Sequence, residues 1–191
     1  MQHLSRFQIK FFTRDQTIID AAQLIPIFHR WIQQNLLDEL IIDVADYRHV
    51  HHGPLMMLVG HGSDYVYDAE DGKPGLLYYR KRDFAGDPQA LIRDAFKRAL
   101  NACALLEKET IKENISFDTS RFCVRILDRL HAPNTAETFA AAKQLIQPVL
   151  EELYPNQSPQ FEHVDDNKQP FTMNVRYDKG PSLQSLNKAL A

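Results

Sequence analysis

Residues 6–12, RFQIKFF, alternate polar and apolar side chains and have a counterpart in RFCVRIL at residues 121–127. Alternation with a period of two predicts a half-buried strand in each place. A helical pattern follows both strands, and each helix carries Gln-Leu-Ile shortly before a proline, within 22–27 and within 143–149. Because the second match falls at nearly the same offset as the first, the sequence favours an internal duplication.

The rest of the pattern predicts further helices and strands. Apolar residues at spacings of three and four predict a helix over 17–37, with a kink or a break at Pro26. Asp71-Gly72 is a hairpin signal because glycine accepts the positive φ of a tight turn, and residues 39–82 are interpreted as a three-stranded antiparallel meander. The other expected elements are a helix opened by Asp87-Pro88 and reaching Glu109 or beyond, a helix over 135–154 capped by Asn134, strands near 161–164 and 171–177, and a last helix from Ser182.

These elements predict an α+β fold, with an antiparallel sheet and helices packed mainly on one face. We interpret the chain as a single domain, 1–191, built from two tandem βαββα-like halves with pseudo-two-fold symmetry, at about 6–113 and 120–191. The other face of the sheet is then less covered, and we expect a ligand groove or a docking surface there. The side chains expected to seal the helix side are Phe7, Ile9, Phe11, Phe28, Trp31, Ile42, Val44, Phe96, Leu100, Phe122, Val124, Ile126, Leu145 and Val149.

Composition narrows the classes of partner. The 191 residues carry a net charge of -3, which provides no overall attraction to nucleic acid. The segment LLYYRKR at 76–82 combines aromatic and cationic side chains, but nearby aspartates dilute this patch, so nucleic acid is disfavoured as a partner. No window is apolar enough for a membrane span or a signal peptide. The two cysteines, Cys103 and Cys123, have no C-x-x-C neighbour, and we expect a cytoplasmic protein.

The segment LVGHGS at 58–63 interrupts a strand pattern and is the first place to look for chemistry. A hydrolase nucleophile elbow requires Gly-x-Ser-x-Gly at the entrance to a helix. Here Gly62 stands at the serine position and a strand pattern follows, so hydrolase chemistry at Ser63 is disfavoured. Glycines inside a strand mark a bulge or the close approach of a ligand or another chain, and the break is therefore a bend first and a candidate site second.

His61 is the candidate acid or base at this break. A turn at His52-Gly53 would place His61 opposite Asp46 and Tyr47 beside Gly60, and Asp64 is the alternative carboxylate partner. The candidate catalytic residues are His61, Asp46 and Asp64, and the candidate ligand-binding residues are Tyr47, Gly60, Gly62, Tyr65, Tyr79 and Arg80.

His49, His51, His52 and His61 lie close together in the sequence, and histidines in such a cluster can bind a metal. The arrangement is unspecific, so no metal is predicted, and no motif names a cofactor. Two hypotheses follow. The first is a non-catalytic binding or regulatory module, expected to be a homodimer, that recognises a small ligand or a protein. The alternative is a small enzyme that uses His61 with Asp46 or Asp64 as an acid–base pair.

Overall fold

The computed structural model describes residues 4, 6–14, 18–50, 54–81, 86–110, 115–166 and 168–191. Within these residues, eight strands form one sheet and four α-helices accompany it. The strands are β1 (Phe7–Thr13), β2 (Ile41–Asp46), β3 (Met56–Gly60), β4 (Ser63–Asp68), β5 (Gly75–Arg80), β6 (Phe117–Ile126), β7 (Gln160–His163) and β8 (Phe171–Arg176). The helices are α1 (Ala21–Gln33), α2 (Pro88–Glu109), α3 (Ala136–Leu153) and α4 (Leu183–Ala189), and a short 3-10 turn, η2 (Glu70–Gly72), lies between β4 and β5.

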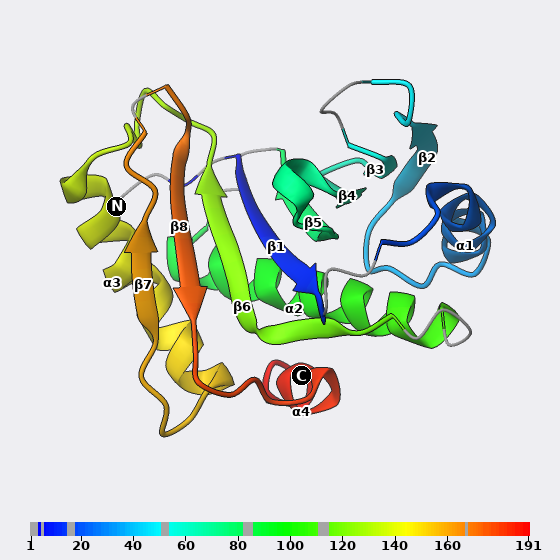
Figure 1. Ribbon diagram of the computed structural model, residues 1–191. Coiled ribbons are helices and arrows are strands. Elements are labelled where there is room, and N and C mark those ends of the chain that lie inside the picture. The colour runs from blue at the N-terminus through cyan, green and yellow to red at the C-terminus, as the bar shows by residue number, and fades with distance from the viewer. Residues whose placement is uncertain are drawn as a thin grey trace.

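The strand order is β2-β3-β4-β5-β1-β6-β8-β7, and every pair of neighbours is antiparallel (Figure 1). The matching segments RFQIKFF and RFCVRIL form most of β1 and the second half of β6, and these strands lie side by side at the centre of the sheet. The predicted α+β class and the antiparallel sheet are therefore confirmed.

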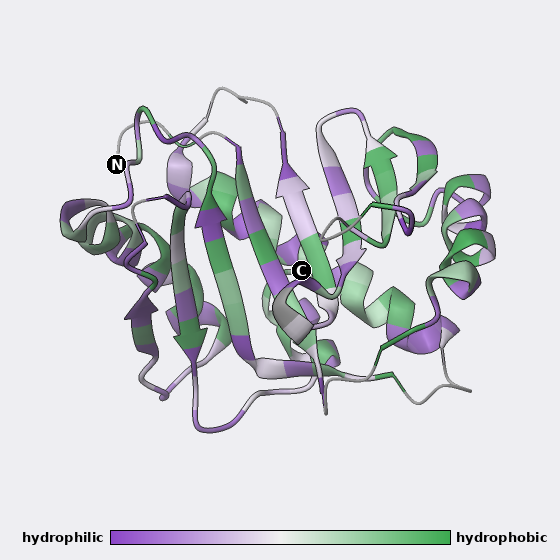
Figure 2. Cartoon of the chain, turned by 45° about the horizontal axis from the view of Figure 1, so that its top comes forward, coloured by the Kyte–Doolittle hydropathy of each residue, from purple (hydrophilic) through white to green (hydrophobic). Residues whose placement is uncertain are grey.

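The alternation along β1 separates the two faces of the sheet, as the alternating hydropathy of the strands in Figure 2 illustrates. Phe7, Ile9 and Phe11 are fully buried on the helix side. The ring of Phe11 meets the ring of Phe96 in α2 edge-on, with 6.3 Å between the ring centroids. Phe96 in turn packs edge-on against Phe122 of β6 at 5.3 Å. The core is thus a layer of aromatic and aliphatic side chains between the central strands and α2.

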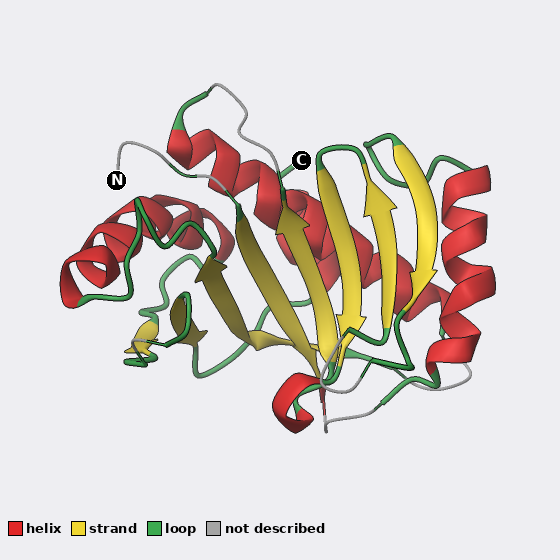
Figure 3. Cartoon of the chain, turned by 90° about the horizontal axis from the view of Figure 1, so that it is seen from above, coloured by secondary structure: helices red, strands yellow, loops and turns green. Residues whose placement is uncertain are grey.

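The helices cover different parts of this side of the sheet. The central helix α2 contacts β1 and β5, α1 contacts β2 and β3, and α3 contacts β7 and β8, while α4 packs on α2 and α3. Figure 3 shows α2 behind the strands, with α1 and α3 at the two ends of the sheet. Asp87 caps α2 by accepting from the N–H of Ala90 at 3.0 Å, with Pro88 in the first turn, as the sequence predicts.

Several local predictions need correction. The region interpreted as a three-stranded meander contains four strands, β2 to β5. The cap of α3 is Thr135, whose hydroxyl accepts from the N–H of Thr138, whereas the amide of Asn134 donates to the carbonyls of Val164 and Asp166. Ile42 is 60% exposed because the register of β2 against β3 shifts between Ile41 and Asp43, so that Ile41 and Val44 pack against the core and Ile42 does not.

Both prolines that lie inside helices are accommodated, and α1 is not broken at Pro26. The hairpin signal at Asp71-Gly72 falls in a longer connection that includes η2, although Gly72 does adopt the expected positive φ of 67°. The connection between β4 and β5 is longer than a two-residue turn. It is therefore long enough for side chains such as Glu70 and Lys73 to extend over the neighbouring strands.

The proposed duplication stays a prediction. The first half contributes five of the described strands and the second half three. No helix among the described residues is long and apolar enough to cross a membrane.

Candidate functional site

The face of the sheet opposite the helices, called the open face below, is hollowed. On β1 this face carries Gln8, Lys10 and Phe12, which alternate with the buried aromatic residues of the helix side. The register places Arg125 beside Gln8 and Cys123 beside Lys10 on the neighbouring strand β6. The open face of the central strands is therefore polar and cationic.

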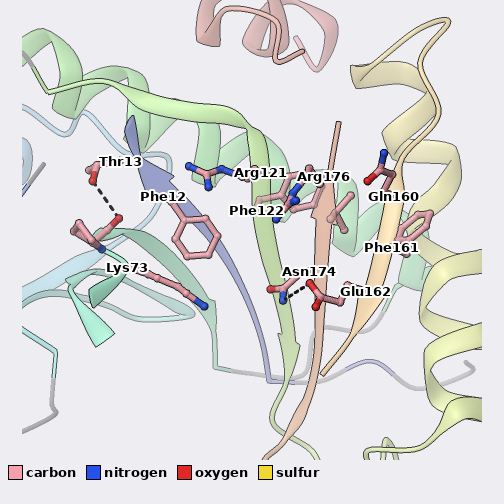
Figure 4. Close-up of a pocket in the computed structure, with 12 residues that line it drawn as sticks. Phe12, Thr13, Lys73, Arg121, Phe122, Gln160, Phe161, Glu162, Asn174 and Arg176 are labelled. Carbon is pink, nitrogen blue, oxygen red and sulfur yellow. Dashed lines mark hydrogen bonds between the residues drawn. The ribbon is translucent and has the colours of Figure 1, made fainter. Parts of the chain in front are cut away.

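The larger hollow, called the main cavity, has a volume of about 460 Å³. It extends over β1, β6, β8 and β7, and the connection before β5 forms one wall (Figure 4). This connection is held at the end of β1, where Thr13 donates from both its N–H and its hydroxyl to the carbonyl of Pro74 at 2.8 and 3.2 Å. The cavity is lined by Phe12, Thr13, Lys73, Pro74, Arg121, Phe122, Gln160, Phe161, Glu162, Asn174, Val175 and Arg176.

Three cations line the main cavity. Arg121 and Arg176 are direct partners in the register of β6 and β8, and Lys73 comes from the opposite wall. Arg121 donates from its Nε to Asp118 at 2.6 Å. Burial would by itself raise the pKa of Asp118, but hydrogen bonds from Ser120 and Arg121 outweigh it and lower that pKa.

The neutral side chains of Gln160 and Asn174 also line the main cavity. The amide of Asn174 donates to Glu162 at 3.3 Å, and the register places Gln160 beside Arg176. The half-buried ring of Phe12 lies in the cavity beside these groups (Figure 4). The lining therefore offers an apolar ring, amide donors and acceptors, and guanidinium groups, a combination suited to orienting a small molecule.

A second hollow of about 290 Å³ adjoins Tyr79, Gln8 and Arg125 on the same face. The ion pair between Lys10 and Asp68 lies on the stretch of β1 between the two hollows, with side chains only 9% and 8% exposed. A longer ion pair of 3.5 Å joins Arg125 to Glu70 of η2. One ion pair thus joins the end of β4 to β1, and the other joins the connection between β4 and β5 to β6.

Cys123 also belongs to the open face, between Arg121 and Arg125 along β6. Burial raises the pKa of its thiol to about 11, and the cations Arg125, Lys10 and Lys73 only partly oppose this shift. The group is therefore a neutral thiol near pH 7, and nucleophilic thiolate chemistry is disfavoured there.

The predicted register around His61 is wrong. In the structure, Asp46 is opposite Met56, and Gly60 is opposite Ile41. The reason is that β2 ends at Asp46, so a connection much longer than a two-residue turn joins it to β3. His61 is exposed, with its backbone N–H donating to the carbonyl of Leu40 at 2.8 Å, and Asp46 pairs with Arg48 instead.

The break around His61 is held by two anchored side chains. The carboxylate of Glu39 accepts from the N–H groups of Gly62 and Ser63 at 2.9 and 2.8 Å, and also from the Ser63 hydroxyl. Asp64 accepts from Lys81 at 2.7 Å and from the N–H of Gly60 at 3.2 Å. Burial raises the pKa of Asp64, against the lowering effect of Lys81.

Gly60 lies in a tightly packed part of this bend. A Cβ at this position would lie 2.5 Å from the carbonyl oxygen of Ser63 and 2.9 Å from Glu39. A glycine is therefore required at position 60, because the carbonyl of Ser63 and the side chain of Glu39 leave no room for a Cβ. That His61 acts with Asp46 or Asp64 as an acid–base pair stays a prediction.

The other predicted ligand-binding residues separate onto different faces. Tyr79 lines the second hollow, and Tyr47 is exposed near the end of β2. Tyr65 is buried against Tyr78, with 5.4 Å between ring centroids, and burial raises its pKa. Arg80 lies on the helix side and pairs with Asp94 of α2.

No metal cluster of three or more His, Cys, Asp or Glu side chains exists among the described residues. His49 lies near Tyr47, with 6.4 Å between the rings, whereas His51 and His52 fall outside the part of the chain that the structure describes.

Sequence reasoning missed the residues of the main cavity. The signal that could have indicated Arg121 is its solvent-facing position in RFCVRIL, but nothing local connects it to Arg176 or Lys73.

No protein-family model matches the chain, and no curated protein matches it in sequence.

Proposed function

We propose that the protein is a non-catalytic module that binds a small ligand in the main cavity of the open face. The observation that supports this proposal is a hollow of about 460 Å³ whose lining combines the ring of Phe12 with the amides of Gln160 and Asn174 and with cationic side chains. Hollows of this size are typical of small-molecule sites, in which a few polar groups orient a ligand on an apolar surface.

The test is an amide NMR titration with four probes: adenosine, adenosine monophosphate, 2-naphthol and 2-naphthoate. At least one probe is expected to shift the resonances of Phe12, Asn174 and their neighbours. The variant Asn174→Trp fills the cavity and should abolish these shifts. The matched control Asn101→Trp places the same ring on an exposed position of α2 and should retain them. If no probe shifts these resonances at about 1 mM, the weak end of small-ligand affinity, the proposal is wrong.

We propose in addition that the protein is an isologous homodimer. The sheet ends in two edge strands, β2 and β7, and an edge strand has unpaired backbone groups that a second copy can satisfy. Leu40, just before the edge strand β2, is 70% exposed and Ile42, within β2, is 60% exposed, and this supports pairing through β2. Light scattering at several concentrations tests the proposal, and a monomer at all of them contradicts it.

The duplication of the two halves is also retained as a proposal. It is supported by parallel connectivity: β1 is followed by α1 and β6 by α3, while β5 and β8 flank these central strands and lead into α2 and α4. A relative built from a single unit would test it, since its structure should superpose on both halves.

For its location we propose the cytosol. The support is that Cys103 and Cys123 are both free thiols, as expected in a reducing compartment. Fractionation of the cells that express the protein tests this placement.

A further inference from the structure

The two arginines of the main cavity occupy an unusual position in the sheet. Arg121 and Arg176 are directly opposite each other on β6 and β8, on the same face. Side chains in such a pair start from Cβ atoms about 5 Å apart, and like charges there destabilise the sheet. Gln160, the neighbour of Arg176 on its other side, is neutral. The row across the three strands therefore carries two positive charges.

The described residues compensate only part of this charge. Asp118 accepts from the Nε of Arg121, and the side chain of Arg121 remains 47% exposed. Arg176 and Lys73 are exposed and form no ion pair with any residue that the structure describes. Glu162, the carboxylate on the floor of the cavity, lies opposite Asn174, one pair further along the strands on this face, and accepts from its amide. One end of the cavity thus has an excess of positive charge.

Guanidinium groups in this arrangement are suited to a particular ligand chemistry. The planar fork of arginine donates two parallel hydrogen bonds to a carboxylate or a phosphate. An anion between Arg121 and Arg176 would relieve their mutual repulsion and use donors that point into a hollow. The ring of Phe12 in the same cavity offers a surface for an apolar, planar part of the ligand (Figure 4).

We infer that the ligand of the main cavity is an anionic small molecule with a planar group, its carboxylate or phosphate held by Arg121 and Arg176. This inference rests on the proposed ligand-binding function and adds the chemical class of the ligand. Lys73, on the opposite wall, contributes to the positive potential.

The experiment compares matched probes that differ in charge. Adenosine monophosphate is titrated against adenosine, and 2-naphthoate against 2-naphthol, with dissociation constants taken from amide NMR shifts. Each anion is expected to bind at least about tenfold more tightly than its neutral partner, as charged hydrogen bonds require. The advantage should shrink as the salt concentration rises, because the cavity is open to solvent. Comparing the two anions distinguishes a phosphate ligand from a carboxylate ligand.

Variants test the role of the arginine pair. Arg176→Gln removes the charge from an exposed side chain and should abolish the tenfold advantage of the anions. Arg176→Lys restores the charge without the planar fork and should recover part of it. Arg48→Gln, at the other edge of the sheet, is the matched control and should leave all four affinities unchanged.

Two outcomes contradict the inference in different ways. If the neutral probes bind in the cavity as tightly as the anions, and Arg176→Gln changes neither, the cavity binds a ligand but not by its charge. If none of the four probes binds, the proposed function itself is wrong, and the anion site is wrong with it.

Discussion

The buried ion pair between Lys10 and Asp68 provides the sharpest test of how the open face is held together. Lys10 lies on the central strand β1 and Asp68 at the end of β4, and both side chains are more than nine-tenths buried. Asp68 also accepts from the N–H of Glu70 at 3.0 Å. The substitution Lys10→Met keeps the length and the apolar stem of the side chain but removes its charge. Among the residues that the structure describes, the N–H of Glu70 is then the hydrogen-bond donor left to the buried carboxylate of Asp68.

The expected cost follows from this geometry. Breaking a buried ion pair by removing one partner costs about 3–5 kcal/mol, since it leaves an uncompensated charge. The remaining hydrogen bond from Glu70 places Lys10→Met at the low end, about 3 kcal/mol. With a denaturant dependence of about 2 kcal/mol/M, the urea midpoint should fall by about 1.5 M. In the double variant Lys10→Met/Asp68→Leu no charge is left, so its stability should lie within about 1 kcal/mol of the wild type.

Equilibrium unfolding in urea, followed by circular dichroism, measures all three proteins. The control is Arg48→Met, which breaks the exposed pair between Arg48 and Asp46 and should leave the midpoint unchanged. A loss of less than about 1 kcal/mol in Lys10→Met would refute the reasoning, because a truly buried carboxylate cannot lose its counterion so cheaply. A double variant as unstable as the single one would refute it as well.

Two further predictions concern the bend at Gly60 and the half-buried thiol of Cys123. Gly60→Ala should destabilise the protein by about 1–3 kcal/mol in urea unfolding, because its Cβ would meet a backbone oxygen at 2.5 Å. Gly86→Ala, whose Cβ would have its nearest neighbour at 3.8 Å, is the control. Equal stability of the two variants would contradict this explanation. The pKa of Cys123 is raised from 9.0 to about 11, so the native protein has about hundredfold less thiolate at pH 8, while the higher pKa makes that thiolate about tenfold more nucleophilic; its reaction with a disulfide reagent should therefore be roughly tenfold slower in the native protein than in urea. The fold favours the neutral thiol, so its contribution to stability is complete below pH 9.0 and is lost as the pH rises through about 11. Equal reaction rates in native and unfolded protein would show that the thiol is not desolvated.

The strands and helices follow from local sequence where one face is consistently apolar. The alternation in RFQIKFF identifies β1 and its buried aromatic residues, because neighbouring side chains of a strand point to opposite faces. Asp87-Pro88 indicates the start of α2 for a similarly local reason, since both residues act within the first turn of the helix. Such predictions need no knowledge of which segments meet. The correct α+β class follows from the order of these elements.

The bend at His61 shows where local reasoning fails. The sequence places glycines on both sides of His61 but contains no signal for the register of β2 against β3. The length of the connection between these strands decides that register, and it places Asp46 opposite Met56. Glu39 then occupies the backbone donors that a ligand would have used. Its role depends on a contact between residues more than twenty positions apart.

The sequence by itself determined the alternation of the central strands, and with it which side chains of β1 and β6 face the helices and which face outward. Only the tertiary structure decided the main cavity, whose lining comes from β1, the connection before β5, β6, β7 and β8. The physical reason is that side-chain direction is a local property of the backbone, whereas register is set by packing between distant segments. Arg121 and Arg176 become neighbours only when β6 and β8 pair. The negative charge that we assign to the ligand is inferred from that pairing.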